Sequence, residues 1–160
     1  MKEIPLTKGT TALVDDADYE YLSQFKWYNS GAYAVRKVVV EGKQVIHNMQ
    51  SYVMADTTTG FIVDHIDRNP LNNQRSNLRL CTQRQNMCNA KRTTGPSGYR
   101  GVGYYYDKRG NKPPRWQVNI VLNGKRKFLG LFDNAEIAAR VYDIAAKELH
   151  GEFAVLNFAS

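Results

Sequence analysis

The chain has 160 residues, enough for one ordinary domain or two small ones, and its 42% hydrophobic and 23% charged residues exclude a disordered protein. Its apolar runs are too short to cross a membrane and its first residues lack a signal-peptide core, so we expect a cytoplasmic protein without a membrane partner. Two cysteines and three scattered histidines exclude a Cys/His zinc site, and a net charge of +7 predicts a polyanionic partner.

The first 45 residues carry the weakest functional signal. Residues 6–14 and 33–40 are predicted as strands, with a short helix over residues 16–25 between them. We expect this segment to act mainly as a scaffold.

The central segment predicts two short strands joined by a polar loop. Residues 62–66 form an apolar strand that carries Asp64 and His65. Residues 69–73 are rich in Asn and Pro, which favour turns. Residues 77–81 alternate polar and apolar side chains, as a strand does.

A helix should follow the second strand, because Thr82 and Gln85 have the spacing of an N-terminal capping box. The order strand, loop, strand, helix allows polar residues from several elements to converge. The candidates are Asp64, His65, Asn77 and Asn86.

These four residue types suit the hydrolysis of a phosphodiester, which needs an activated water and a cation on the phosphate. A histidine such as His65 titrates near neutrality and can act as the base. Asp64 and Asn86 offer hard oxygen donors, which suit one Mg²⁺ or Mn²⁺ rather than a soft metal. Asn77 can hold the His65 ring through its other nitrogen and fix its orientation.

Residues 63–86 resemble the HNH nuclease motif, a ββα-metal fold, in the His-Asn-Asn version of phage and intron-encoded homing endonucleases. The resemblance implies that Asp64 and Asn86 are metal ligands, that His65 is the general base and that Asn77 orients this base. Flanking positions also match the family pattern: Asp67, Asn69, Asn73, Leu78, Arg79, Thr82 and Asn89. Upstream the chain departs from the pattern.

The departure is a Gln50–Ser51 pair where the family usually has His-Arg. His47 lies three residues away and is a candidate substitute. The substitution keeps open a second interpretation, a regulator that binds DNA without cutting it. A third is a nuclease directed at RNA.

A polar linker over residues 93–98 is predicted to separate a nuclease module, residues 1–92, from a second module, residues 99–160. The stretch from 93 to 132 holds eight basic residues and one acidic residue, a charge equal to that of the whole chain. Such a basic field indicates binding to a polyanion.

The second module should be a three-stranded antiparallel sheet with one helix. Strands are predicted over residues 99–106, 116–122 and 125–131, with a loop at 108–114 and a hairpin turn at Asn123–Gly124. Trp116 is expected in the core and Tyr105 on the other face of the sheet.

The helix should begin after Asp133 as N-cap, with Glu136 completing the cap, and end at Gly151. Its predicted apolar stripe consists of Ile137, Val141, Ala145 and Leu149.

The sheet face away from the helix carries Gln117 and Asn119, flanked by Arg100, Arg115 and Arg126. Arg can pair with guanine, and Asn or Gln with adenine, and a sheet of this width can enter the major groove.

Residues 99–158, with YRGV at the start and FLGLFDNAEIAARVYDIAAKELHGEFAVLNF at the end, resemble the Apetala-2/ethylene-response-factor DNA-binding domain, which also occurs fused to HNH nucleases in phages and bacteria. Arg100 and Arg126 keep the family's Arg, and Phe128 replaces its Trp. Gly103, Tyr105, Asn119 and Val121 stand where plant members use Arg or Glu, so the DNA sequence recognised should differ. The expected DNA contacts are Arg100, Tyr105, Arg115, Gln117, Asn119, Lys125, Arg126, Lys127 and Phe128.

Together the two resemblances imply an α+β protein, a ββα-metal HNH module followed by a three-stranded sheet packed on one helix. The expected activity is metal-dependent cleavage of double-stranded DNA by a homing endonuclease, one strand per active site, in a bacterial or phage-infected cell. We expect a monomer or a weak homodimer, and the N-terminal segment to make minor DNA contacts.

Overall fold

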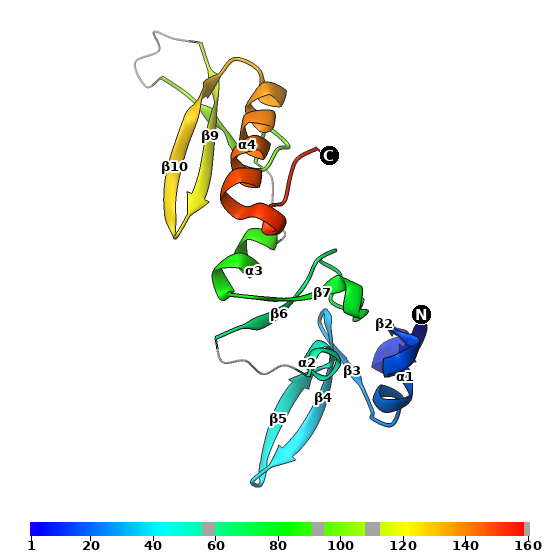
Figure 1. Cartoon of the computed structure of the whole chain (residues 1–160). Coiled ribbons are helices and arrows are strands. Elements are labelled where there is room, and N and C mark those ends of the chain that lie inside the picture. Colours follow the sequence, from blue (N-terminus) through cyan, green and yellow to red (C-terminus); the bar gives the residue numbers. More distant parts are fainter. Residues whose placement is uncertain (56–59, 91–94, 108–112, 159–160) are drawn as a thin grey trace. The chain divides into compact units, whose positions relative to one another are not determined.

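The computed structural model describes residues 1–55, 60–90, 95–107 and 113–158. Within these ranges the chain is α+β, as predicted, with small antiparallel sheets and four α-helices. It divides into two compact units, Met1–Gln83 and Arg84–Ser160 (Figure 1). This division lies earlier in the chain than the boundary expected at residues 93–98, which stays a prediction.

The first unit is built from short elements that form three small sheets and two helices. In chain order they are β1 (Lys2–Pro5), a 3-10 turn (Thr7–Gly9), β2 (Thr11–Val14), α1 (Asp16–Ser23), β3 (Tyr28–Ser30), β4 (Tyr33–Val40), β5 (Lys43–Asn48), α2 (Met49–Met54), β6 (Ile62–His65), a 3-10 turn (Arg75–Asn77) and β7 (Leu78–Cys81).

One strand prediction in this unit is wrong and the others hold with small changes at their ends. Residues 6–14 are not one strand, because Lys8 and Gly9 have φ angles of 68° and 71° and reverse the chain between β1 and β2. Left-handed angles of this kind end an extended segment. The strand expected over residues 33–40 is confirmed as β4.

The core of the first unit anchors the hairpin formed by β6 and β7. Trp27 and Leu22 are buried, and the Trp27 indole donates a 2.8 Å hydrogen bond to the Leu22 carbonyl. Leu78 on β7 and Leu71 in the preceding loop pack on the same cluster. The Leu13 amide on β2 also donates to the Leu71 carbonyl at 2.8 Å. The loop of the hairpin is therefore held by both apolar contacts and backbone hydrogen bonds.

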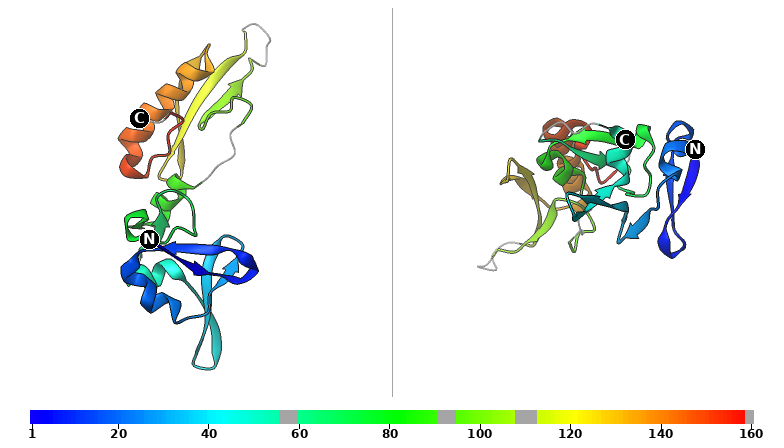
Figure 2. Two further views of the ribbon diagram at one scale, coloured as in Figure 1. Left: turned by 90° about the vertical axis from the view of Figure 1, so that its right-hand side faces the viewer. Right: turned by 90° about the horizontal axis from the view of Figure 1, so that it is seen from below.

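The second unit contains the expected three-stranded sheet, in the order β10-β9-β8, with one long helix on one face (Figure 2). Its elements are α3 (Gln83–Asn89, which starts one residue before the unit), β8 (Val102–Tyr105), β9 (Arg115–Leu122), β10 (Lys125–Phe132), α4 (Ala135–His150) and a 3-10 turn (Gly151–Phe153). The loop predicted over residues 108–114 falls mostly on 108–112, outside the described residues.

The turn between β9 and β10 confirms the hairpin signal in the sequence. Asn123 and Gly124 have φ angles of 52° and 77°, as a two-residue hairpin turn requires. The first strand is shorter than predicted, because Gly101 has a φ of 76° and the chain before it turns.

The start and the buried face of α4 differ from the predictions. Asn134, not Asp133, is the N-cap, and its side chain accepts hydrogen bonds from the amides of Glu136 and Ile137. Asp133 instead accepts a 2.7 Å hydrogen bond from Arg115. The end of the helix is as predicted, with Gly151 as C-cap.

The apolar stripe predicted for α4 is displaced by about one residue. Ile137 is 55% exposed, whereas the buried apolar positions are Ala138, Ala139, Tyr142 and Ala146. Small alanine side chains let the helix approach the sheet closely, so the packed face contains smaller residues than hydrophobicity alone selects. Within the described part of the chain, no helix is long and apolar enough to cross a membrane.

Gly101 should be essential for the stability of the second unit. A Cβ at this position would lie 2.0 Å from the Tyr142 ring and 2.9 Å from the Asn119 carbonyl oxygen. We expect Gly101→Ala to lower the free energy of unfolding by about 2–4 kcal/mol, because it combines a clash with an unfavourable φ. Calorimetric unfolding would measure the change.

Gly103→Ala is the matched control, because a Cβ at Gly103 would meet no atom within 4 Å. This variant should stay within about 1 kcal/mol of the parent protein. Equal stability of the two variants would contradict the packing described for Gly101.

Candidate active site and nucleic-acid interface

Asp64 lies on β6 in a buried ion pair with Arg79 on β7. The two residues are directly opposite in the strand register, and one carboxylate oxygen of Asp64 accepts from Arg79 Nε at 3.0 Å and from its Nη2 at 2.9 Å. Both side chains are almost fully buried. A buried carboxylate needs such compensation, and Arg79 supplies it within the hairpin.

His65 follows on β6 and is 5% exposed. Its Nε2 lies 3.3 Å from Asn73 Oδ1, and its ring lies 6.2 Å from the Tyr33 ring. Burial lowers the pKa of His65 below its ordinary value of 6.5, against the opposing effects of the Asn73 hydrogen bond and of the charges on Asp67 and Asp64. The ring is therefore neutral at pH 7 and available as a base.

The contact with Asn73 also sets the tautomer of the ring. An amide oxygen only accepts hydrogen bonds, so this contact favours the tautomer that carries its proton on Nε2. Asn73 is fully buried, and its backbone amide donates to the Leu13 carbonyl at 2.8 Å. In the sequence it is visible only as one flanking match to the HNH pattern.

Asn77 does not make the contact predicted for it. Its Oδ1 accepts from the Asp67 amide at 3.0 Å, and its Nδ2 donates to an Asp67 carboxylate oxygen at 2.9 Å and to the Asn72 carbonyl at 2.8 Å. No hydrogen bond joins it to the His65 ring within the described residues. Asn77 instead shapes the loop that carries Asn73, so its effect on His65 is indirect.

The same loop is stabilised by the Asp67 carboxylate. It accepts from the Asn69 amide and the Asn72 side chain, both at 2.8 Å, as well as from Asn77. Partial burial raises the pKa of Asp67, but these hydrogen bonds outweigh it and hold the pKa below the ordinary value. Asp67 is consequently charged at neutral pH and keeps all its hydrogen bonds.

Gln50, the residue at the position of the family histidine, is buried on α2. It is 5% exposed, and its Oε1 has no hydrogen-bond partner in the described structure. An unsatisfied buried acceptor costs about 1–3 kcal/mol. His47, the candidate substitute, lies on β5, where its Nδ1 is 3.4 Å from the Tyr52 hydroxyl.

The four predicted residues are brought together only in part. Asp64 and His65 are consecutive on β6, and the Asn77 carbonyl accepts from the amide that follows His65, at 2.9 Å. Asn86 is on α3 and belongs to the second unit.

The residue types available to a metal are hard oxygen donors. Within the described ranges, no group of three or more His, Cys, Asp and Glu side chains gathers as a metal site. The two expected ligands, a carboxylate and an amide oxygen, are of the type that hard divalent cations prefer.

The strand register of the second unit assigns the predicted DNA contacts to opposite faces of the sheet. Residues directly opposite in an antiparallel pair share a face, and neighbours along a strand alternate. Val118 and Ile120 on β9 are buried against α4. The other face of the sheet, which we call the outer face, carries Tyr105, Arg115, Gln117, Asn119, Val121, Arg126 and Phe128.

Polar and aromatic side chains dominate the outer face. Phe128 is 56% exposed, and Gln117 Nε2 donates to Asn119 Oδ1 at 3.4 Å. Tyr105 pairs with Arg115 in the register and lies on this face, as predicted. Trp116 lies on the opposite face with the core, also as predicted.

Three basic residues of the predicted set are not on the outer face. Lys125 and Lys127 pair with Leu122 and Ile120 and are on the opposite side of β10, although both are exposed. Arg100 precedes β8 and directs its guanidinium to carbonyl and hydroxyl oxygens of the second unit, the nearest at 2.7 Å. Alternation along β10 could have revealed the two lysines, but nothing in the sequence indicates the position of Arg100.

Comparison with known proteins links both halves of the chain to described families. Residues 59–88 match the HNH endonuclease model. An uncharacterized HNH endonuclease of Acanthamoeba polyphaga mimivirus is 32% identical over 153 residues, which cover 94% of this chain and 76% of that protein. Protein 3.8 of Escherichia phage T7 is 33% identical over 96 residues, 59% of this chain and 74% of its own length.

A different group of relatives matches a shorter part of the chain. The AP2-like ethylene-responsive transcription factor TOE2 of Arabidopsis thaliana is 44% identical over 62 residues, 39% of this chain but 12% of that protein. Both resemblances inferred from the sequence are thereby confirmed, the second over part of the chain.

The lowered pKa of His65 should make the stability of the metal-free protein depend on pH. Because folding favours the neutral ring, its contribution is complete above about pH 6.5 and is lost as the pH falls through that value toward the folded-state pKa. The unfolding free energy of the parent protein should therefore fall relative to that of His65→Gln between about pH 7.5 and 5.5. Urea unfolding in EDTA would measure this, and a pH-independent difference between the two proteins would contradict it.

Proposed function

The chain belongs to the HNH endonuclease family, and on that premise we propose that it is a divalent-metal-dependent DNA endonuclease of homing type. The observation that carries the proposal is the Asp64–His65 pair on β6, buried and backed by Arg79 and Asn73. A carboxylate and a neutral imidazole on consecutive residues of one strand provide groups that are suited to phosphodiester hydrolysis.

In the proposed reaction, His65 removes a proton from the water whose oxygen bonds to phosphorus. The bond from phosphorus to the leaving oxygen breaks, and that oxygen takes up a proton. The neutral state of His65 at pH 7 supports this role. Asp64 and Asn86 would hold one Mg²⁺ or Mn²⁺, which would stabilise negative charge on the phosphate and on the leaving oxygen.

We assign DNA binding to the outer face of the sheet in the second unit. Arg126 and Arg115 provide charge there, and Gln117 and Asn119 provide amides that can pair with base edges. The similarity to AP2-type transcription factors supports a duplex DNA partner over RNA. Lys125 and Lys127 on the opposite side of β10 are better suited to backbone phosphates than to bases.

A single site of this kind cuts one strand per binding event. A monomer would therefore nick DNA, and a double-strand break would require a weak homodimer or rebinding.

A second candidate function is DNA binding without cleavage. The observation in its favour is Gln50, whose buried acceptor lacks a partner at the position of the family histidine. Cleavage that depends on His65 would exclude this alternative.

His65→Ala should reduce the rate of DNA cleavage by at least about a thousandfold and leave DNA affinity within about twofold, because it removes only the base. The assay is relaxation or linearisation of supercoiled plasmids carrying a recognised site, with Mg²⁺ or Mn²⁺ and with EDTA as the metal-free reference.

His47→Ala is the matched control, because this ring contacts Tyr52 in the scaffold. It should cut at close to the parental rate. If His65→Ala lost DNA cleavage and DNA binding equally, the role of His65 would be structural. If only His47→Ala lost cleavage, His47 and not His65 would be the general base.

Arg126 and Lys127 provide a matched pair for the assignment of the outer face, since they are adjacent and exposed but lie on opposite sides of β10. We expect Arg126→Ala to weaken specific binding by about 1–3 kcal/mol and to relax the sequence preference, whereas Lys127→Ala should weaken binding to all sequences alike. Fluorescence anisotropy with specific and scrambled duplexes would measure both.

If about six phosphates are contacted, affinity should also fall about a thousandfold between roughly 50 and 200 mM salt. If Lys127→Ala lost the preference for the specific duplex and Arg126→Ala kept it, the opposite side of β10, and not the outer face, would recognise the bases.

A further inference from the structure

The Arg100 side chain forms hydrogen bonds that connect the C-terminal end of α3 to α4 in the second unit. Its Nη2 donates to the Cys88 carbonyl at 2.7 Å and its Nη1 to the Ala90 carbonyl at 3.0 Å. Its Nε donates to the Tyr142 hydroxyl on α4 at 3.1 Å. A guanidinium placed on the last carbonyls of a helix satisfies their hydrogen bonds and opposes the negative end of the helix dipole.

The backbone of Arg100 is itself held in place by a partly buried network of hydrogen bonds. Its amide donates to Asn157 Oδ1 at 2.6 Å, and its carbonyl accepts from Asn157 Nδ2 at 3.2 Å. Asn157 also donates two hydrogen bonds to the Asp143 carboxylate from its backbone amide and one from its side chain. Asp143 lies on the buried face of α4, so Arg100 is a rigid point of attachment.

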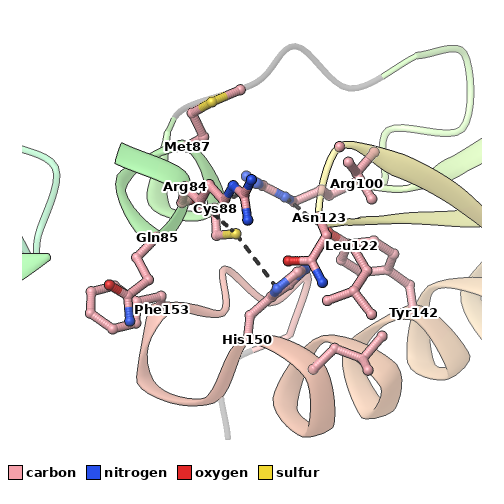
Figure 3. A pocket seen from close by; sticks show the side chains of 13 residues that line it. Arg84, Gln85, Met87, Cys88, Arg100, Leu122, Asn123, Tyr142, His150 and Phe153 are labelled. Carbon is pink, nitrogen blue, oxygen red and sulfur yellow. Dashed lines mark hydrogen bonds between the residues drawn. The ribbon is translucent and has the colours of Figure 1, made fainter. Parts of the chain in front are cut away.

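A second contact holds the same helix at Cys88, one residue before its end. Cys88 Sγ lies 3.5 Å from His150 Nδ1, at the last residue of α4. Figure 3 shows these two side chains facing each other in a pocket of about 420 Å³ that Arg100 and Tyr142 also line. Helix α3 is thereby fixed to α4 at two points within one compact unit.

The contacts of Arg100 reach the turn of α3 that contains Asn86. Its carbonyl accepts a 3.0 Å hydrogen bond from the Ala90 amide, and the Ala90 carbonyl is one of the two bound by Arg100. The guanidinium thus acts on the helical turn that begins at Asn86.

We propose that Arg100 is a positioning residue for metal binding, one that sets Asn86 through α3 and connects it to the DNA-binding sheet. This inference rests on the proposed function, because it takes Asn86 as a metal ligand. It assigns Arg100 a role different from the DNA contact expected for an arginine at this position.

Two substitutions at Arg100 test the proposal. Arg100→Gln removes the positive charge and the guanidinium that donates to three oxygens. Arg100→Lys keeps the charge, but its single ammonium cannot reproduce the planar geometry that reaches all three oxygens at once. Arg140→Gln is the matched control, because Arg140 is a second arginine of this unit whose guanidinium pairs with Glu136 on α4 and lies over the Phe158 ring. Circular dichroism would establish that each variant is folded.

Three quantities should then be measured. They are the hydrogen exchange of the α3 amides without metal, the binding of Mn²⁺ to the protein–DNA complex by its paramagnetic resonance signal, and DNA affinity in EDTA. We expect Arg100→Gln to speed exchange at the Ala90 amide and to weaken Mn²⁺ binding about 10–100-fold, with DNA affinity within about twofold of the parent. Arg100→Lys should be intermediate, and Arg140→Gln should match the parent protein.

Other outcomes separate this inference from the proposed function. Unchanged exchange and Mn²⁺ binding in Arg100→Gln would overturn it, as would a loss of DNA affinity as large as the loss of metal affinity. Asn86→Ala serves as the reference: if it leaves Mn²⁺ binding unchanged, the metal-ligand assignment in the proposed function is wrong. If Asn86→Ala weakens Mn²⁺ binding and Arg100→Gln does not, only the role of Arg100 fails.

Discussion

The hydrogen bonds between Asn77 and Asp67 hold the loop of the β6–β7 hairpin, and the surroundings of His65 depend on them. They join the two ends of a long polar connection that has little apolar surface to bury. With the loop closed in this way, Asn73 reaches the His65 ring and the amide of Asn73 reaches β2. The site thus uses amide and carboxylate groups where most hairpins use tight turns, which explains why asparagine is so frequent in this segment.

The sequence predicts the elements of the molecule well because short-range signals determine them. The alternating pattern from residue 116 to 122, the Asn123–Gly124 turn and the strands that carry Asp64 and Leu78 are all found where the sequence predicts them. Local chemistry was less decisive at the start of α4, where Asp133 and Asn134 are both good caps. An ion pair with Arg115 occupies Asp133, and Asn134 becomes the cap.

The features that could not be predicted depend on contacts between distant residues. Which asparagine reaches His65 is decided by the path of the loop across β2, and no spacing rule encodes it. The direction of the Arg100 side chain is likewise decided by α3 and α4, which are 12 and 42 residues away from it at the contact points. A resemblance to a family transfers the position of a residue, but the surrounding chain determines what its side chain touches.

The sheet of the second unit separates the residues that hold the fold from those available for recognition. Val102, Val118 and Ile120 belong to the apolar cluster that packs on α4, whereas the residues of the outer face alternate with them and are not part of that cluster. Even Gly103, which faces outward, has open space beside it. If the outer face binds DNA as proposed, its sequence preference can change with little loss of stability, and one nuclease scaffold can acquire new target sites.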